Sequence, residues 1–194
     1  EHLKKEGYQI EAVRNKGYHL VHCPDVMSKA EIESLVHTKW AGTHVVCYEE
    51  TDSTNIRAKD AGEKGEAHGT LFVAERQAAG KGRRGRSWES PAGVSIYMTI
   101  LLRPELAPVE APRLTPLMAI AVVEGIRRVT GLRCQIKWPN DVIFKGKKIC
   151  GILTEMSAEI GLINYLVIGV GVNVNQESFS EEIQEKATSL RLEL

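Results

Sequence analysis

The amino-acid sequence predicts an α+β fold, in which a mixed, largely antiparallel sheet carries helices on one side. Three observations lead to this prediction. Runs of strand-forming residues dominate the chain of 194 residues, as in VSIYMTILL at 94–102 and NYLVIGVGVNV at 164–174. Several such runs are joined by short turn-forming segments, which is typical of hairpins. Between Leu114 and Val129, apolar residues instead recur at helical spacing, which predicts an amphipathic helix packed on the sheet.

The first 24 residues are expected to form a separate unit. Within GYQIEAVRNKGYHL, two short strand-like pieces flank a turn at 14–17, where Gly17 supplies turn chemistry. A two-stranded hairpin is marginally stable alone, so residues 1–24 are expected to be a remnant of another domain. Pro24 and Asp25 indicate a linker, and the main domain is expected to cover residues 25–194.

The main domain is expected to alternate strands and helices. The expected strands are 44–50, 69–75, 94–102, 134–138, 142–144, 148–155 and 164–174. Helix-capping residues precede three further segments, namely Ser28 with Glu31, Ser53 or Thr54 before residues 55–63, and Ser178 with Glu181 in an acidic tail expected to be helical.

Composition narrows the class of protein. The 25 Lys and Arg residues balance 25 Asp and Glu residues, which argues against a protein that coats nucleic acid with its whole surface. No apolar run is long enough to span a membrane and no secretory signal is present, so a cytoplasmic globular protein is expected. No CxxC pair and no zinc-type ligand spacing occur, so we expect no metal site and four reduced thiols, at Cys23, Cys47, Cys134 and Cys150.

The segment GKGRRGRSW, residues 80–88, concentrates four cations, three glycines and a tryptophan in this neutral chain. It has three interpretations: a solvated loop, a segment that binds DNA or RNA, or a clamp for a small anion. Glycines let backbone N–H groups approach an anion, arginine offers paired donors to phosphate or carboxylate, and Trp88 offers a stacking surface for a base. The third interpretation predicts a nucleotide site. Further polar residues for it are Lys137, Asn140, Asp141, Lys148 and Asn173.

Common enzyme signatures are absent from the sequence. The basic loop has Glu75 and Gly82 where a Walker A loop needs small and hydroxyl residues, and GVGVNV at 169–174 lacks the third glycine of a dinucleotide fingerprint. GVSIY at 93–97 lacks the last glycine of a nucleophile elbow, and no H-E-x-x-H occurs.

Five motifs in a fixed order, however, resemble the biotin protein ligases. These are DSTN at 52–55, QAAGKGRRGRSW at 77–88, KWPND at 137–141, KKICGIL at 147–153 and GVGVN at 169–173. The resemblance covers about residues 44–190 and implies a catalytic domain related to class II aminoacyl-tRNA synthetases. The N-terminal hairpin resembles the end of a winged helix-turn-helix, as in the bifunctional ligase/repressor class. The small C-terminal β domain of that family is not expected within this chain.

The resemblance implies a reaction in two steps. Biotin and ATP, with Mg²⁺, give biotinyl-5′-AMP and pyrophosphate, and biotin then passes to a lysine of a biotin carboxyl carrier domain. It implies Lys148, Arg83 and Asp141 as catalytic residues. The biotin-binding residues implied are Ser53, Thr54, Asn55, Gln77, Gly80, Lys81, Gly82, Arg83, Lys148 and Gly151. Those implied for ATP and the adenylate are Arg83, Arg86, Trp88, Lys137, Asn140 and Asn173.

Two alternatives stay open beside this reading. One is a lipoate ligase, built on a related catalytic fold, and the other is a DNA-binding repressor without ligase activity. In the bifunctional class, ligase activity and binding of operator DNA occur together, and a homodimer is expected when ligand is bound. Lys81 departs from the arginine that many relatives have, which replaces a planar donor group with a point charge.

Overall fold

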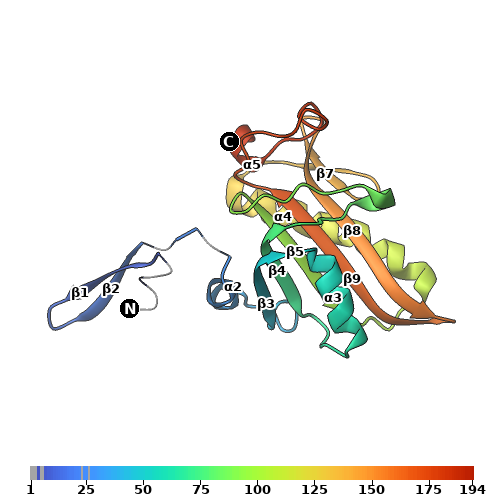
Figure 1. Cartoon of the computed structure of the whole chain (residues 1–194), viewed down its shortest axis with the longest axis horizontal. Helices are drawn as coiled ribbons and strands as arrows, with labels where there is room; N and C mark the ends of the chain where they lie inside the picture. The colour runs from blue at the N-terminus through green and yellow to red at the C-terminus, as the bar shows by residue number, and fades with distance from the viewer. Residues whose placement is uncertain (1–3, 5–6, 23, 26) are drawn as a thin grey trace.

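The computed structural model describes residues 4, 7–22, 24–25 and 27–194, and Cys23 therefore lies outside the described residues. A seven-stranded sheet forms the main body, and a two-stranded hairpin lies beside it (Figure 1). The strands are β1 (Gln9–Val13), β2 (Gly17–His22), β3 (Val45–Thr51), β4 (Leu71–Gln77), β5 (Ser95–Leu102), β6 (Gln135–Lys137), β7 (Asp141–Phe144), β8 (Lys147–Glu159) and β9 (Leu162–Asn173). The helices are α2 (Lys29–Leu35), α3 (Thr54–Glu63), α4 (Leu114–Thr130) and α5 (Leu190–Glu193), with 3₁₀ turns at η1 (Arg83–Gly85) and η2 (Pro108–Arg113).

The large sheet has the order β3-β4-β5-β9-β8-β7-β6. Strands β3 and β4 pair in parallel, while β4 with β5, β5 with β9 and the remaining neighbours pair antiparallel. The prediction of a mixed, largely antiparallel sheet in an α+β fold is therefore confirmed. The long β8–β9 hairpin lies near the middle of the sheet and supplies much of its apolar core.

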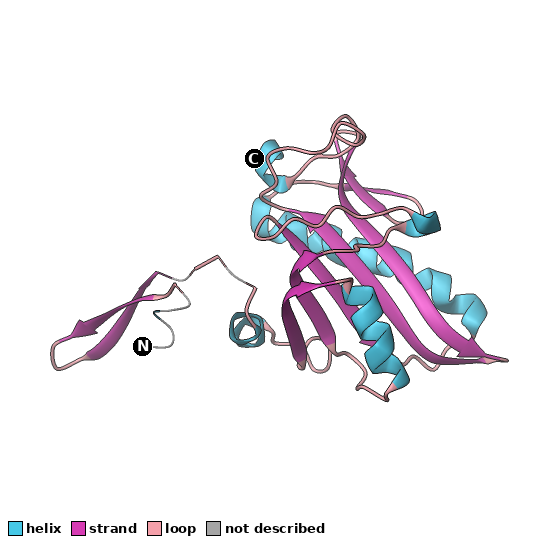
Figure 2. Ribbon diagram, viewed as in Figure 1, coloured by secondary structure: helices cyan, strands magenta, loops and turns pink. Residues whose placement is uncertain are grey.

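The helices cover both faces of the sheet, so the expectation that they lie on one side is wrong (Figures 1 and 2). Along β9, Leu166 and Ile168 pack in the cluster that includes α4, whereas Tyr165 and Val167 pack in the cluster that includes Ala58 of α3. Side chains alternate between the faces of a strand, so a strand that is apolar at every position is buried on both faces. The continuous apolar run of β9 is the physical reason for the two-sided cover.

Capping residues begin the first two helices at the expected places. Ser28 Oγ accepts a hydrogen bond of 3.2 Å from the Glu31 N–H at the start of α2, and Ser53 is the N-cap of α3. The prediction that Ser178 and Glu181 begin a helix in the acidic tail is wrong, because residues 181–186 form turns. Backbone pairing explains this difference: Lys148 N–H donates to Lys186 O and Thr188 N–H donates to Lys148 O, which holds the tail beside β8.

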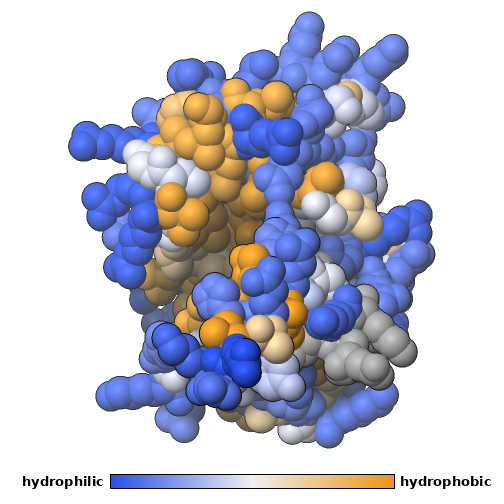
Figure 3. Space-filling model, turned by 90° about the vertical axis from the view of Figure 1, so that its left-hand side faces the viewer, coloured by the Kyte–Doolittle hydropathy of each residue, from blue (hydrophilic) through white to orange (hydrophobic). Residues whose placement is uncertain are grey.

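The N-terminal hairpin forms as expected, with β1 and β2 antiparallel and Asn15 and Gly17 at positive φ in the turn. Large apolar side chains remain exposed on it, including Tyr18 and Leu20. In Figure 3, viewed from the hairpin side, the largest apolar area lies at the upper left, above the level of the hairpin. Within the described part of the chain, no helix is long and apolar enough to cross a membrane.

Candidate active site

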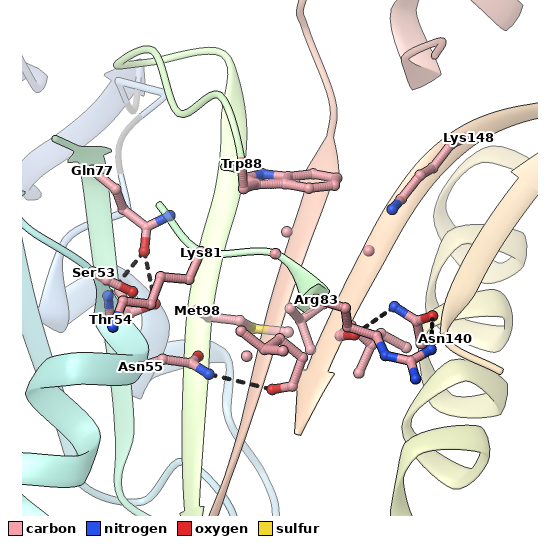
Figure 4. Close-up of a pocket in the computed structure, with 17 residues that line it drawn as sticks. Ser53, Thr54, Asn55, Gln77, Lys81, Arg83, Trp88, Met98, Asn140 and Lys148 are labelled. Carbon is pink, nitrogen blue, oxygen red and sulfur yellow. Dashed lines mark hydrogen bonds between the residues drawn. The ribbon is translucent and has the colours of Figure 1, made fainter. Parts of the chain in front are cut away.

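A cavity on the α3 side of the sheet brings together residues from all five motifs (Figure 4). Its walls come from the N-terminus of α3, the end of β4, the basic loop, β5, the KWPND turn, the first half of β8 and the second half of β9. It is lined by Ser53, Thr54, Asn55, Gln77, Lys81, Gly82, Arg83, Trp88, Met98, Asn140, Lys148, Gly151, Ile152, Leu153, Gly169, Val170 and Gly171.

The N-terminus of α3 forms a polar wall whose groups are held in place. Gln77 Oε1 accepts hydrogen bonds from Thr54 N–H, at 2.9 Å, and from Thr54 Oγ1, at 3.1 Å. Ser53 does not use its side chain to cap its own helix. Its backbone N–H donates instead to Asp52 Oδ1 at 2.6 Å, and Arg57 donates to both oxygens of that carboxylate. Burial raises the pKa of Asp52, but hydrogen bonds from Ser53, Thr51 and Arg57 outweigh it and lower this pKa.

A chain of hydrogen bonds connects this wall to the basic loop. Gln77 Nε2 donates to Ser90 Oγ at 2.9 Å, and Ser90 Oγ donates to the Trp88 carbonyl oxygen at 3.0 Å. Gln77 thus donates through Nε2 to Ser90 and accepts through Oε1 from Thr54, so the orientation of its amide is fixed. The end of β4 therefore positions the last residue of the loop.

The basic loop is a small irregular hairpin. Gly82 N–H donates to Arg86 O at 2.7 Å, and Trp88 N–H donates to Gly80 O at 2.8 Å. Between them, Arg84 has a φ of 57° and Gly85 a φ of 73°, which reverses the chain. Gly80 is required by crowding, because a Cβ there would collide with the Trp88 carbonyl oxygen.

Trp88 lies on a floor made of glycines. A Cβ at Gly171 would lie 2.6 Å from the indole, and one at Gly151 would lie 2.7 Å from it. Side chains at these positions would fill the place of the ring, so the absence of Cβ atoms permits a planar group to lie against β8 and β9. The indole Nε1 is buried and has no hydrogen-bond partner among the described residues.

The other end of the cavity is cationic. Lys148 Nζ lies 2.7 Å from Asp141 Oδ1 and 5.1 Å from the centre of the Trp88 ring. Arg83 Nη1 donates to Asn140 Oδ1 at 2.9 Å, and Asn140 Nδ2 donates to the Ile152 carbonyl at 2.9 Å. The KWPND turn thus holds one cation by a carboxylate and another by an amide. Two cations at one end of a narrow cavity favour anions there.

Comparison with known proteins identifies the family. Residues 47–173 match the Biotin/lipoate A/B protein ligase family. The chain belongs to this family. It is 44% identical over 192 residues to the Bifunctional ligase/repressor BirA of Bacillus spizizenii, an alignment that covers 98% of this chain and 59% of that protein. The chain therefore spans less than two thirds of the length of this relative.

Two solved biotin protein ligases share the fold. The enzyme from Aquifex aeolicus in complex with biotin and ATP matches with a TM-score of 0.64 and 36% identity, covering 76% of this chain and 59% of that one. The enzyme from Leishmania major in complex with biotinyl-5-AMP matches with a TM-score of 0.63 and 27% identity, covering 77% of this chain and 64% of that one. The resemblance to biotin protein ligases and the predicted catalytic fold are confirmed.

Eleven of the residues that the ligase-family resemblance singled out line the cavity, and five do not. Gly80 lies against the Trp88 carbonyl oxygen, and Asp141 forms an ion pair with Lys148. Arg86 and Lys137 are exposed, and the buried Asn173 donates to Thr188 O at 3.0 Å, which ties β9 to the tail.

Sequence reasoning missed the floor of this ligase-family site, above all Gly169 and Gly171. The signal was available in GVGVN, because two glycines two residues apart lie on the same face of a strand. It also missed Thr99, Ser90 and Glu155, whose side chains hold Thr54, Gln77 and Asn55 in place.

Proposed function

We propose that the complete protein is a biotin protein ligase. It activates biotin with ATP to biotinyl-5′-AMP and pyrophosphate and then transfers biotin to a lysine of a biotin carboxyl carrier domain. Support comes from membership of the ligase family and from relatives whose names state biotin ligation or complexes with biotin, ATP and biotinyl-5-AMP. We place the protein in the cytoplasm.

The observation that carries the proposal is the arrangement of one cavity, in which neutral hydrogen-bonding groups at the start of α3 lie across from the cations Lys148 and Arg83, with Lys81 of the basic loop near the α3 side. Ser53, Thr54 and Gln77 offer neutral hydrogen-bonding groups, which suit the ureido ring of biotin. Lys148 and Arg83 lie at the opposite side of the glycine floor (Figure 4). We propose that the carboxylate of biotin and the α-phosphate of ATP meet there. Approach of one anion to another requires this compensating charge.

In the first step, a carboxylate oxygen of biotin forms a bond to the α-phosphorus, and the bond from that phosphorus to pyrophosphate breaks. Lys148 exchanges its contact with Asp141 for one with the reacting anion, and Arg83 stabilises the developing negative charge. The residues proposed to contact the nucleotide are Arg86, Trp88, Lys137, Asn140 and Asn173. Trp88 is proposed to stack on the base.

In the second step, the amine of the acceptor lysine forms a bond to the acyl carbon, and AMP leaves. Release of Lys148 from Asp141 frees that carboxylate, which then accepts the proton of the incoming amine. Mg²⁺ is proposed to arrive on the phosphates of ATP, because no group of three or more His, Cys, Asp or Glu side chains in the described residues could hold a metal ion.

A role in repression is proposed for the complete protein as well, on the basis of the N-terminal hairpin and the name of its relative. Residues 1–24 are proposed to end a winged helix-turn-helix that binds operator DNA, with residues 25–194 as the catalytic domain. Ligand binding is proposed to favour a homodimer, which would couple biotin status to DNA binding.

Calorimetry with biotin and with lipoic acid separates the two substrates that the family name covers. We expect saturable binding of biotin by this chain and no measurable binding of lipoic acid, which has no ureido group for the polar wall. Tighter binding of lipoic acid than of biotin would contradict the proposed function.

A further inference from the structure

We propose that Glu155, a residue outside the five motifs, is a positioning residue for biotin binding, because it fixes the side chain of Asn55 on the floor of the cavity. The inference rests on the proposed function. It assigns a role to a carboxylate that does not itself line the cavity.

Glu155 receives two hydrogen bonds from one face of α3. Its Oε2 accepts from Asn55 Nδ2 at 2.9 Å, and its Oε1 accepts from Lys59 Nζ at 3.0 Å. Residues four apart on a helix lie on the same face, so Asn55 and Lys59 approach the carboxylate together. Because Glu155 belongs to β8, this contact joins the N-terminal part of α3 to the strand that carries Lys148 and Gly151.

The contact determines which way the Asn55 amide faces. Asn55 is 4% exposed, and its Oδ1 accepts from Thr99 Oγ1 at 2.7 Å. Its Nδ2 donates to Glu155. It also donates, at 3.3 Å, to the Leu153 carbonyl oxygen, the contact drawn as a dashed line from Asn55 in Figure 4. A flipped amide would place its oxygen against two acceptors, the Glu155 carboxylate and the Leu153 carbonyl oxygen. Of the two acceptors for Asn55 Nδ2, the Glu155 carboxylate is the charged one and makes the shorter hydrogen bond.

Asn55 has no room to find another position. It lies directly on β9, where a Cβ at Gly169 would collide with its Oδ1. Thr99, which is fully buried, also lies within hydrogen-bond distance of Thr54 Oγ1, at 2.8 Å, so a displaced Asn55 would disturb the wall formed by Thr54 and Gln77. The biotin end of the cavity is therefore sensitive to a carboxylate on β8.

The charges around Glu155 agree with this role. Partial burial raises the pKa of Glu155, but hydrogen bonds from Asn55 and Lys59 and the charges of Lys59 and Lys81 lower it overall. Glu155 therefore accepts as a carboxylate at neutral pH. Lys81 belongs to the basic loop, so the same carboxylate also attracts the loop toward this end of the cavity.

The test compares Glu155→Ala, Glu155→Gln and Lys59→Met by calorimetry with biotin, with thermal melting of each variant. We expect Glu155→Ala to weaken biotin binding by about 10-fold, since a hydrogen bond to a charged group is lost and the buried Asn55 amide keeps only the longer contact with the Leu153 carbonyl oxygen. Glu155→Gln keeps an acceptor oxygen for Asn55 and is expected to restore most of the affinity. Lys59→Met removes the ion pair without touching Asn55 and should bind biotin as the unaltered chain does.

Three results would overturn the inference. One is unchanged affinity in Glu155→Ala, and another is an equal loss in Lys59→Met, which would indicate a strut between α3 and β8 that does not act through Asn55. The third comes from Asn55→Ala: adding Glu155→Ala to it should weaken binding no further, so additive losses would contradict coupling of the two residues. A failure of the unaltered chain to bind biotin would contradict the proposed function itself, and this inference with it.

Discussion

At the scale of single residues, the ammonium of Lys148 lies between a carboxylate and an aromatic ring at the cationic end of the cavity. Both neighbours hold a cation beside the glycine floor, where a substrate anion would take over the contact with Asp141. Lys147, one residue earlier on β8, is exposed and does not line the cavity, so it provides a matched control.

We predict that Lys148→Ala lowers the rate of adenylate formation by about 10²- to 10³-fold, the usual cost of losing one electrostatic contact to a transition state. Lys147→Ala should leave the rate unchanged. Biotin-dependent release of pyrophosphate by the complete protein measures both variants. Equal rates in the two variants would remove Lys148 from the mechanism.

A second residue-scale prediction concerns Tyr165, whose hydroxyl donates to Glu63 Oε1 at 2.7 Å. Burial and the bond to Glu63 raise the pKa of Tyr165 to about 12. Because the folded-state pKa lies above the ordinary value of 10.0, this stabilisation is complete below pH 10 and is lost as pH rises toward 12. The urea concentration at the midpoint of unfolding should therefore fall less in Tyr165→Phe than in the unaltered chain when the pH rises from about 9 to about 11.5. An identical fall would contradict the assignment.

At the scale of secondary-structure elements, two helical glycines are predicted to respond to alanine in opposite directions. In α3, a Cβ at Gly62 would lie 2.8 Å from the Tyr165 ring, so Gly62→Ala should destabilise the fold by about 1–3 kcal/mol. In α4, Gly125 is exposed and a Cβ there meets nothing within 4 Å, so Gly125→Ala should stabilise it by about 0.5–1 kcal/mol. Chemical denaturation measures both, and destabilisation of similar size at both positions would contradict this packing.

The basic loop is the element whose behaviour depends most on ligand. Four cations within residues 80–88 repel one another, although backbone bonds between Gly82 and Arg86 and between Gly80 and Trp88 hold the loop together. We predict that biotin with ATP protects this loop from trypsin, because the adenylate neutralises the cations and packs against Trp88. Cleavage at the turn with Lys145 and Lys147 is the internal control. Equal cleavage of the loop with and without both substrates would contradict ligand-induced ordering.

At the scale of the whole molecule, the local motifs predicted the secondary-structure elements and many site residues, but they did not predict the long-range packing. Most strands, α3 and α4 follow from capping residues and periodicity, and the residues of KWPND and KKICGIL converge because their hairpins are short. The two-sided helical cover was missed, because the apolar run of β9 indicates burial without saying which helix lies on which face. The Asn55–Glu155 contact joins residues 100 positions apart, and no local pattern in the sequence indicates it.

The most direct test of the account is mass spectrometry of the complete protein after incubation with biotin and ATP. The polar wall at the start of α3 and the cations Lys148 and Arg83 across the cavity predict a bound species with the mass of biotinyl-5′-AMP, formed only when both substrates are present and strongly reduced in Lys148→Ala. Binding of biotin without any adenylate, or an adenylate formed from lipoic acid in preference to biotin, would contradict it.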